Sequence, residues 1–257
     1  MCIRARSRHL QTLFLLAVLS FLFVIPTQAQ VTTASMSGTV MFQDEPVIGA
    51  TVLAVHEPSG TNYGTITNVD GRFSLQGMRT GGPYKVTISY VGYQSAVYSG
   101  ITLQLGENYN LNVKLKESSE TLDEIVITAA KTKFNTEKTG ATTNISSSQI
   151  TSLPTINRSI SDIARLSPYA SDMSFAGGDG RSTNFTVDGA NFNNNFGLSD
   201  NLPGGGNPIS MDAIEEVQVV IAPFDVRQTN FIGGGINAIT KSGTNTFKGS
   251  AYTYFQN

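Results

Sequence analysis

The sequence predicts a mainly β protein, made of a small β-sandwich, a following α+β domain and a final alternating strand. Three observations support this prediction. Short runs of alternating apolar and polar residues, separated by turn signals about every 8–12 residues, fill the first half of the chain. Short strand-like runs between long loops rich in Gly and Asn fill the second half. An isolated apolar run at 122–129 lies between the two halves.

The first 29 residues predict a secretory signal peptide. Three arginines precede an apolar run at 13–25, which is short for a membrane span, and Pro26 breaks that run. Small residues then offer a cleavage site, so we expect the mature chain to begin at Gln30. An uncleaved anchor is the alternative.

The composition of the mature chain excludes several kinds of site. From Gln30 onwards there is no cysteine, no tryptophan and a single histidine, His56. Disulfides, cysteine nucleophiles, cysteine-rich zinc sites and sites with two histidines are therefore excluded. Losing three arginines and no acid takes the net charge from −2 to −5, which argues against nucleic acid as a partner. We predict no catalytic residue, no metal and no cofactor, and we expect His56 to lie on the surface of a strand.

Residues 30–116 predict the β-sandwich, with about seven strands. One strand carries Tyr109, Leu111, Val113 and Leu115 on one face and polar residues on the other. Similar alternation places Val86, Ile88 and Tyr90 together, and Thr51 with Leu53 and Val55. Between two further runs, Asp70-Gly71 predicts a hairpin turn, because tight reverse turns need positive φ.

Several stretches of this domain resemble the carboxypeptidase-regulatory-like family. They are SGTV at 37–40, PVIGATV at 46–52, TNVDGRFSL at 67–75 and YKVTISYVGY at 84–93. The resemblance implies a non-catalytic, transthyretin-like β-sandwich. Such domains often precede receptors in outer-membrane proteins of the Bacteroidota type.

The linker at 117–140 contains the apolar run LDEIVITA at 122–129, with polar, charged stretches on both sides. A short β-prone run without a neighbour in sequence is suited to pair with the sheet edge of another protein. The alternative is an ordinary last strand of the preceding sandwich.

This run resembles the TonB box of TonB-dependent receptors. The resemblance implies capture by the periplasmic protein TonB, which works with an inner-membrane energising complex. The partner-binding residues are then Asp123, Glu124, Ile125, Val126, Ile127 and Thr128.

Residues 141–245 predict an α+β domain. We expect a strand leading into a short helix at 144–153 and a second helix capped by Ser159 or Ser161 and ended by Pro168. The second helix places Ile160, Ile163 and Ala164 on one face. A strand at 184–187, a helical turn at 211–215 and a strand at 217–221 complete the prediction.

This domain resembles the plug domain of the same receptors. The motifs are RSISD at 158–162, FTVDG at 185–189, IEEVQV at 214–219 and GGGINAITKSG at 233–243. Many family members have Arg-Gly-Pro after the Ile-Glu-x-Val strand, whereas this chain reads IAPFDVR at 221–227. That wording is similar to the Oar-like or SusC-like branch, which sets this chain apart from siderophore and vitamin receptors. The resemblance to the receptors as a whole implies a plug that gates import of a ligand.

Two polar loops of this domain are the expected ligand-facing surface. Their amides and hydroxyls suit an oligosaccharide or a peptide better than an iron chelate. The residues are Asp179, Arg181, Asn191, Asn193, Asn194 and Asn195.

Residues 246–257 alternate apolar and polar side chains and resemble the first strand of an outer-membrane β-barrel, here truncated. An outer-membrane location, contact with membrane lipid and a possible surface lipoprotein partner follow from the resemblance. The run GGGINA at 233–238 matches a dinucleotide motif by letter, but a strand follows it rather than a helix. The rival functions are a soluble exported β-sandwich adhesin or interaction protein, and a peptidase accessory subunit.

Overall fold

The structure is a computed structural model that describes residues 31–117, the backbone of 125–128, and residues 141–153, 155, 158–193, 208–221, 232–249 and 251. The expected signal peptide lies outside these residues. In the described part of the chain, no helix is long and apolar enough to cross a membrane. Val31–Asn257 group together as one unit.

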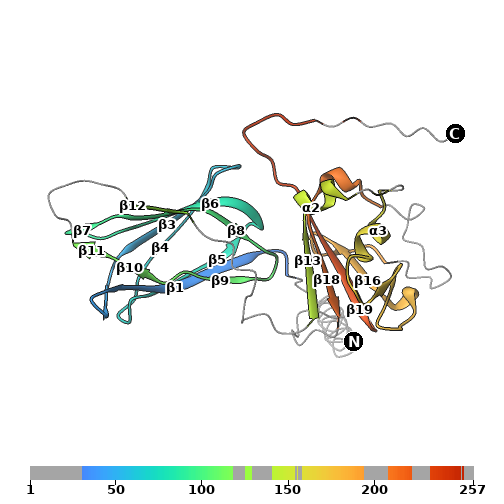
Figure 1. The fold of residues 1–257 in the computed structure, drawn as a ribbon, viewed down its shortest axis with the longest axis horizontal. Coiled ribbons are helices and arrows are strands. Elements are labelled where there is room, and N and C mark those ends of the chain that lie inside the picture. The colour runs from blue at the N-terminus through green and yellow to red at the C-terminus, as the bar shows by residue number, and fades with distance from the viewer. Residues whose placement is uncertain are drawn as a thin grey trace, which may run out of the picture. The chain divides into compact units, whose positions relative to one another are not determined.

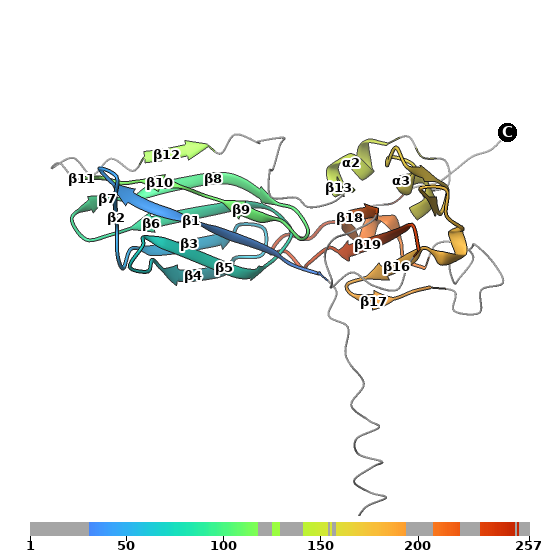
Figure 2. The same cartoon turned by 90° about the horizontal axis from the view of Figure 1, so that it is seen from below.

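The first domain is a sandwich of two sheets (Figures 1 and 2). One sheet surrounds β1, which pairs antiparallel with β2 and β5 and parallel with β9 and β10. The other sheet has the order β12-β8-β6-β3-β4, and β7 pairs with β11 in a separate ladder. The strands are β1 (Ala34–Phe42), β2 (Glu45–Pro46), β3 (Thr51–His56), β4 (Thr61–Ile66), β5 (Arg72–Met78), β6 (Gly81–Ser89), β7 (Tyr93–Gln94), β8 (Ala96–Leu103), β9 (Asn108–Asn110), β10 (Val113–Lys114), β11 (Lys116–Glu117) and β12 (Ile125–Thr128).

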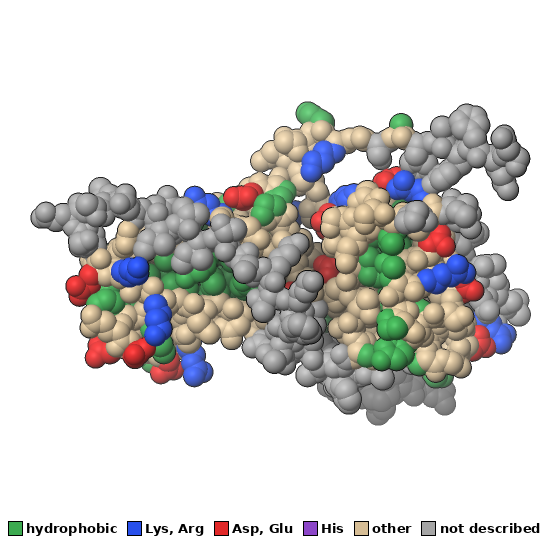
Figure 3. Space-filling view, in the orientation of Figure 1, with side chains coloured by type: hydrophobic (Ala, Val, Ile, Leu, Met, Phe, Trp, Pro, Cys, Tyr) green, Lys and Arg blue, Asp and Glu red, His purple; other side chains and the backbone are tan. Residues whose placement is uncertain are grey.

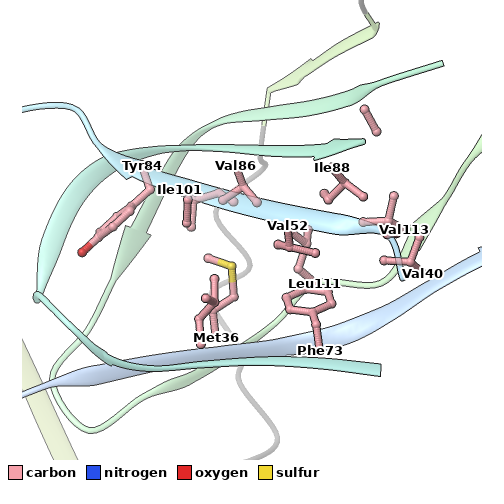
Figure 4. Packing of buried hydrophobic residues seen from close by; sticks show 14 of the residues in the cluster. Met36, Val40, Val52, Phe73, Tyr84, Val86, Ile88, Ile101, Leu111 and Val113 are labelled. Carbon is pink, nitrogen blue, oxygen red and sulfur yellow. The ribbon is translucent and has the colours of Figure 1, made fainter. Parts of the chain in front are cut away.

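The core of the sandwich lies between the two sheets. Met36 and Phe73 come from the sheet around β1 and point toward Val52 and Val86 of the other sheet (Figure 4). Each such buried side chain contributes about 1.5–3 kcal/mol relative to exposure. The alternation predicted for the last strands is confirmed, since Leu111, Val113 and Leu115 are buried and the polar residues between them are exposed.

The predicted inner face of β3 and the surface position of His56 are wrong. Val52 and Ala54 are fully buried, while Leu53 is 39% exposed, so the inward set is one residue out of phase with the expectation. Because side chains in a strand alternate with period two, His56 falls on the same inner face as Val52 and Ala54 and is only 6% exposed.

The His56 ring has two neighbours in the core. Its Nδ1 lies 2.6 Å from the Ser59 Oγ, and its ring centroid lies 4.8 Å from that of Tyr84. Burial lowers the pKa of His56 below its usual 6.5, and the nearby Arg79 charge lowers this pKa further.

The Asp70-Gly71 turn exists, but it does not form the predicted hairpin. Gly71 has φ +68°, and its N–H donates to the Asn68 carbonyl at 2.9 Å. The Asn68 Oδ1 accepts from the backbone N–H groups of Asp70 and Arg72. However, β4 pairs with β3 and β5 pairs with β1, so the turn carries the chain from one sheet to the other.

Gly38 in β1 lets another segment approach closely. A Cβ atom at Gly38 would lie 1.9 Å from the Leu111 carbonyl oxygen. The chain is held at this point because the Leu111 N–H donates to the Ser37 carbonyl at 2.8 Å. Gly38 is therefore required by close packing of two backbones.

The second domain is a five-stranded sheet of order β13-β18-β19-β16-β17 with short helices on one face (Figure 1). The predicted strand-to-helix step and the strand at 184–187 are confirmed, and the strand predicted at 217–221 begins earlier, at Ile214. The elements are β13 (Ala141–Ser146), α2 (Ser147–Ser152), α3 (Ile160–Ala164), β14 (Ala170–Ser171), β15 (Ser174–Phe175), η1 (Gly180–Ser182), β16 (Asn184–Val187), β17 (Ala190–Asn191), η2 (Met211–Ala213), β18 (Ile214–Ile221) and β19 (Gly234–Thr240).

The helix α3 begins as predicted and ends earlier than predicted. The Ser159 side chain accepts from the Asp162 N–H, and the three predicted apolar residues of the helix are buried. The helix ends at Ala164 because the N–H groups of Leu166 and Ser167 bond three residues back, which tightens the chain before Pro168 is reached.

The predicted terminal strand is only partly described. Residues 241–249 and 251 have no regular secondary structure, and the Phe247 side chain is fully exposed. The rest of that stretch lies outside the described residues. The letter match at 233–238 falls largely in strand β19, which supports its rejection as a dinucleotide motif.

Candidate functional site: an edge strand and two polar loops

The interaction strand is β12, and it is paired within the chain. Its Ile125, Val126, Ile127 and Thr128 lie opposite Ala96, Val97, Tyr98 and Ser99 of β8, in a parallel ladder. Figure 2 shows β12 at the edge of the sandwich, running along β8. The run therefore has a partner strand in its own chain, although not a neighbour in sequence, and this pairing agrees with the alternative of a last strand of the preceding sandwich. Asp123 and Glu124 lie outside the described residues.

Only one edge of β12 is occupied among the described strands. β12 is the terminal strand in the order β12-β8-β6-β3-β4, so β8 lies on one side and no described strand lies on the other. Alternate residues of a strand direct their backbone N–H and C=O groups to opposite edges. About half of the backbone groups of β12 are thus directed away from β8.

The pairing of β12 with β8 is short, which limits its contribution to stability. It joins four residues of each strand. A backbone hydrogen bond contributes about 0.5–1.5 kcal/mol net, while ordering one residue costs about 1–2 kcal/mol. These opposing terms nearly cancel over four residues, so β12 is held weakly compared with the central strands.

The first polar loop holds an ion pair between two of the expected ligand-facing residues. The Arg181 guanidinium donates to the Asp179 carboxylate, with Nη2 and Oδ2 2.7 Å apart, and the Arg181 backbone N–H donates to the same side chain. Both side chains are about half exposed. These hydrogen bonds from Arg181 lower the pKa of Asp179. The loop therefore presents a locally neutralised pair.

The second polar loop is partly engaged in the fold. The Asn193 Oδ1 accepts from the Phe185 N–H at 2.6 Å, and its Nδ2 donates to the Asn184 Oδ1 at 2.8 Å. The Asn191 side chain accepts from the Asn193 N–H. Asn193 thus holds the edge of β16, whereas Asn194 and Asn195 lie outside the described residues.

Sequence reasoning missed a buried polar cluster on the sheet face opposite the helices. Both oxygens of Glu216 accept from the Leu105 N–H, at 3.2 and 3.0 Å, and Glu216 is 4% exposed. The Asn144 Nδ2 donates to Glu216, and the Gln218 Nε2 donates to the Leu105 carbonyl. The signal was the alternation of Glu216 and Gln218 with valines in β18, which places polar groups on one face of a buried strand.

The described side chains do not form a metal site or a strongly charged patch on the face in view. In the described ranges, no group of three or more His, Cys, Asp or Glu residues is arranged to hold a metal ion. On the face drawn in Figure 3, basic and acidic side chains are interspersed.

The comparisons with known proteins cover both domains. Residues 35–116 match the model of the carboxypeptidase regulatory-like domain. The TonB-dependent transporter Oar of Myxococcus xanthus is 23% identical over 236 residues, 86% of this chain and 21% of the transporter. The TonB-dependent receptor SusC of Bacteroides thetaiotaomicron is 37% identical over 83 residues, 32% of this chain and 7% of the receptor.

Two further similarities were found, one to a curated receptor and one to a solved structure. The TonB-dependent receptor P26 of Formosa agariphila is 28% identical over 115 residues, 45% of this chain and 10% of the receptor. A cohesin–X-dockerin complex of Acetivibrio cellulolyticus has a chain with 18% identity and a TM-score of 0.27, over 33% of this chain and 58% of that chain. That structural likeness is too low to bear on function.

The matched region is a small part of each relative. This chain spans about a fifth or less of the length of the curated relatives. Residues 35–116 therefore form a carboxypeptidase regulatory-like domain, in a chain whose curated relatives are TonB-dependent transporters and receptors rather than enzymes.

Proposed function

We propose that this chain is the N-terminal part of an outer-membrane, TonB-dependent transporter, and that residues 122–129 are the segment that TonB captures. The single observation that carries the proposal is the short edge strand β12, which has no described strand on its outer side, in a chain similar to such transporters. Strand addition needs a strand edge whose backbone groups can pair with the partner. Main-chain hydrogen bonds then supply the affinity, and alternate side chains supply the specificity.

In this proposal the α+β domain at 141–245 is the plug. A plug closes the channel of a barrel whose first strand begins within 246–257 and whose outer surface contacts membrane lipid. TonB, driven by its inner-membrane complex, pulls on the captured segment and opens or remodels the plug. The step is a conformational gate that needs no covalent chemistry.

The imported ligand is proposed to be an oligosaccharide or a peptide. The expected ligand-facing loops offer amide groups, and the charges of Asp179 and Arg181 neutralise each other in an ion pair. Such a surface suits hydrogen bonding to a neutral polar ligand better than capture of a charged chelate. A lipoprotein on the cell surface is proposed to help the transporter capture this ligand.

The pairing of β12 with β8 favours a rival function, that of an exported interaction protein in which β12 is a permanent strand of the sandwich. In that case the segment would have no role in energised import. The rival predicts that TonB has no measurable affinity for this chain, which gives a direct way to separate the two functions.

The test is binding of purified residues 30–257 to an immobilised C-terminal domain of TonB. Ile125→Pro removes a ladder donor and is expected to weaken binding by about tenfold or more. Thr136→Pro places the same residue type elsewhere in the linker and serves as the control with unchanged binding. Equal binding of the Ile125→Pro and Thr136→Pro variants would overturn the assignment, and no binding of the unmodified chain would favour the rival.

A further inference from the structure

We propose that the sandwich presents β12 to its partner, so that the strand supplied by TonB adds to the outer edge of β12 while β8 stays paired with the inner edge. This inference rests on the function proposed above and assigns a role to the carboxypeptidase regulatory-like domain. The domain would act as a platform that holds the captured segment as a ready-made strand.

The edge of β12 supports this inference. β12 pairs with β8 through one side and ends the sheet order β12-β8-β6-β3-β4. The backbone groups that point away from β8 are not used by this pairing, so an added strand need not displace it. An edge of this kind is a template for pairing with another chain.

The strand that carries β12 is itself firmly held. β8 pairs along its other side with β6, where Ala96 lies opposite Ile88 and Val97 opposite Thr87. Ala96 is 7% exposed and belongs to the core of the sandwich, and Val97, on the opposite face of β8, is 1% exposed, so both faces of β8 are covered here. The platform therefore stays in place whether or not β12 is occupied on its outer edge.

The chain between β11 and β12 is short and starts close to the part of β8 that pairs with β12. β11 ends at Glu117, opposite Tyr93, and β12 begins at Ile125, opposite Ala96. The Tyr93 ring packs on Phe42 with centroids 4.9 Å apart, which fixes the strand that pairs with the end of β11. Residues 118–124 join the two positions, so seven residues keep the segment close to β8 at a high effective concentration.

The partner is a protein that offers an extended strand at a sheet edge, preferably with basic residues nearby. Two acids, Asp123 and Glu124, directly precede β12, and the mature chain carries a net charge of −5, from −2 less three arginines. Opposite charge beside the added strand would favour encounter and fix its register. Because the segment is already extended, less conformational freedom is lost on binding.

The decisive experiment locks β12 onto β8 with a disulfide. The paired residues are replaced in the variant V97C/V126C, in a mature chain with no other cysteine. Adjacent strands are about 4.7–4.9 Å apart, within the range of Cα distances that disulfides span. The pair S99C/T128C, at more polar positions, is the second variant, and V126C/S99C, offset by two residues, is the control that should not close.

Binding to the TonB C-terminal domain is then measured before and after oxidation. We expect the oxidised V97C/V126C and S99C/T128C chains to bind within about threefold of their reduced forms, because the outer edge stays free. Failure of both pairs to close, or loss of binding on oxidation that reduction restores, would overturn the inference.

A synthetic peptide of residues 118–140 separates this inference from the proposed function. The free peptide must be ordered on binding, so it should bind TonB about tenfold more weakly than the chain. A peptide that binds as tightly as the chain, or more tightly, would contradict presentation while preserving the proposed function. No binding by either peptide or chain would defeat the proposed function itself.

Discussion

Val126 lies directly opposite Val97 in a parallel ladder, so the segment that resembles a partner-binding box is the edge strand of the sandwich that precedes it. β12 can belong to this sheet and still pair with a partner, because a strand has two edges and β8 occupies one of them.

Gly38→Ala should destabilise the sandwich. The new Cβ would lie 1.9 Å from the Leu111 carbonyl oxygen, so the two backbones must move apart. We expect a loss of about 1–3 kcal/mol in the free energy of unfolding, measured by denaturation followed by circular dichroism. Gly64→Ala is the matched control, because its nearest neighbour, the Leu53 Cδ1, lies 4.0 Å away. An equal effect of the two substitutions would contradict the packing described for Gly38.

Stability should fall in mild acid because of His56. Its folded pKa is lowered by burial and by Arg79, whereas the unfolded chain has the usual value of 6.5. The unfolded state therefore binds the proton first, and the free energy of unfolding decreases as the pH falls from 6.5 through the lowered folded pKa. Well above pH 6.5 both states are neutral and this contribution is constant. In His56→Gln the decrease over this window should be absent, and thermal unfolding at several pH values measures it.

The buried Glu216 should protect the Leu105 amide. Glu216→Ala removes both oxygens that accept from this N–H, so hydrogen exchange at Leu105 should become faster. An unsatisfied buried donor costs about 1–3 kcal/mol, which sets the expected loss of local stability. Glu215→Ala is the control, since the Glu215 side chain accepts one long bond from Ser147, at 3.3 Å. Unchanged exchange at Leu105 in Glu216→Ala would contradict this contact.

The two polar loops should respond differently to truncation. Asn193→Ala removes the acceptor of the Phe185 N–H and one hydrogen bond of the Asn184 side chain, so we expect a loss of about 1–2 kcal/mol. Arg181→Ala removes an exposed ion pair and should change stability by less than about 1 kcal/mol. Urea denaturation compares them, and the opposite order would show that Asn193 does not support β16. Arg181→Ala is therefore the cleaner variant for testing ligand contact.

Much of the fold was predictable because alternation acts locally. Leu111, Val113 and Leu115 are buried as predicted, and the Ser159 cap of α3 is present. The errors arise where the deciding partner is distant in sequence. The Asp70-Gly71 turn has the expected chemistry, yet β4 and β5 join different sheets, which no local signal reveals. In β3 both faces carry apolar residues, so the pattern could not say that His56 faces inward.

The candidate site was predictable in position but not in pairing. The apolar run containing Ile125 and Ile127 forms a strand as expected, but its partner β8 is not signalled by any turn or spacing. The role of Asn193 in holding β16 could not be predicted from a loop rich in Asn. The sequence does not distinguish a side-chain amide in solvent from one that forms a hydrogen bond with a backbone N–H group.

The most direct test of the central claim is hydrogen exchange on residues 30–257, with and without saturating TonB C-terminal domain. Proposed capture of the segment by strand addition predicts slower exchange in the complex at alternate residues of Ile125–Thr128, those whose amides lie on the outer edge and gain partners. Protection at β8 should persist if the sandwich presents the segment. Unchanged exchange at all four residues under saturating TonB would contradict the account.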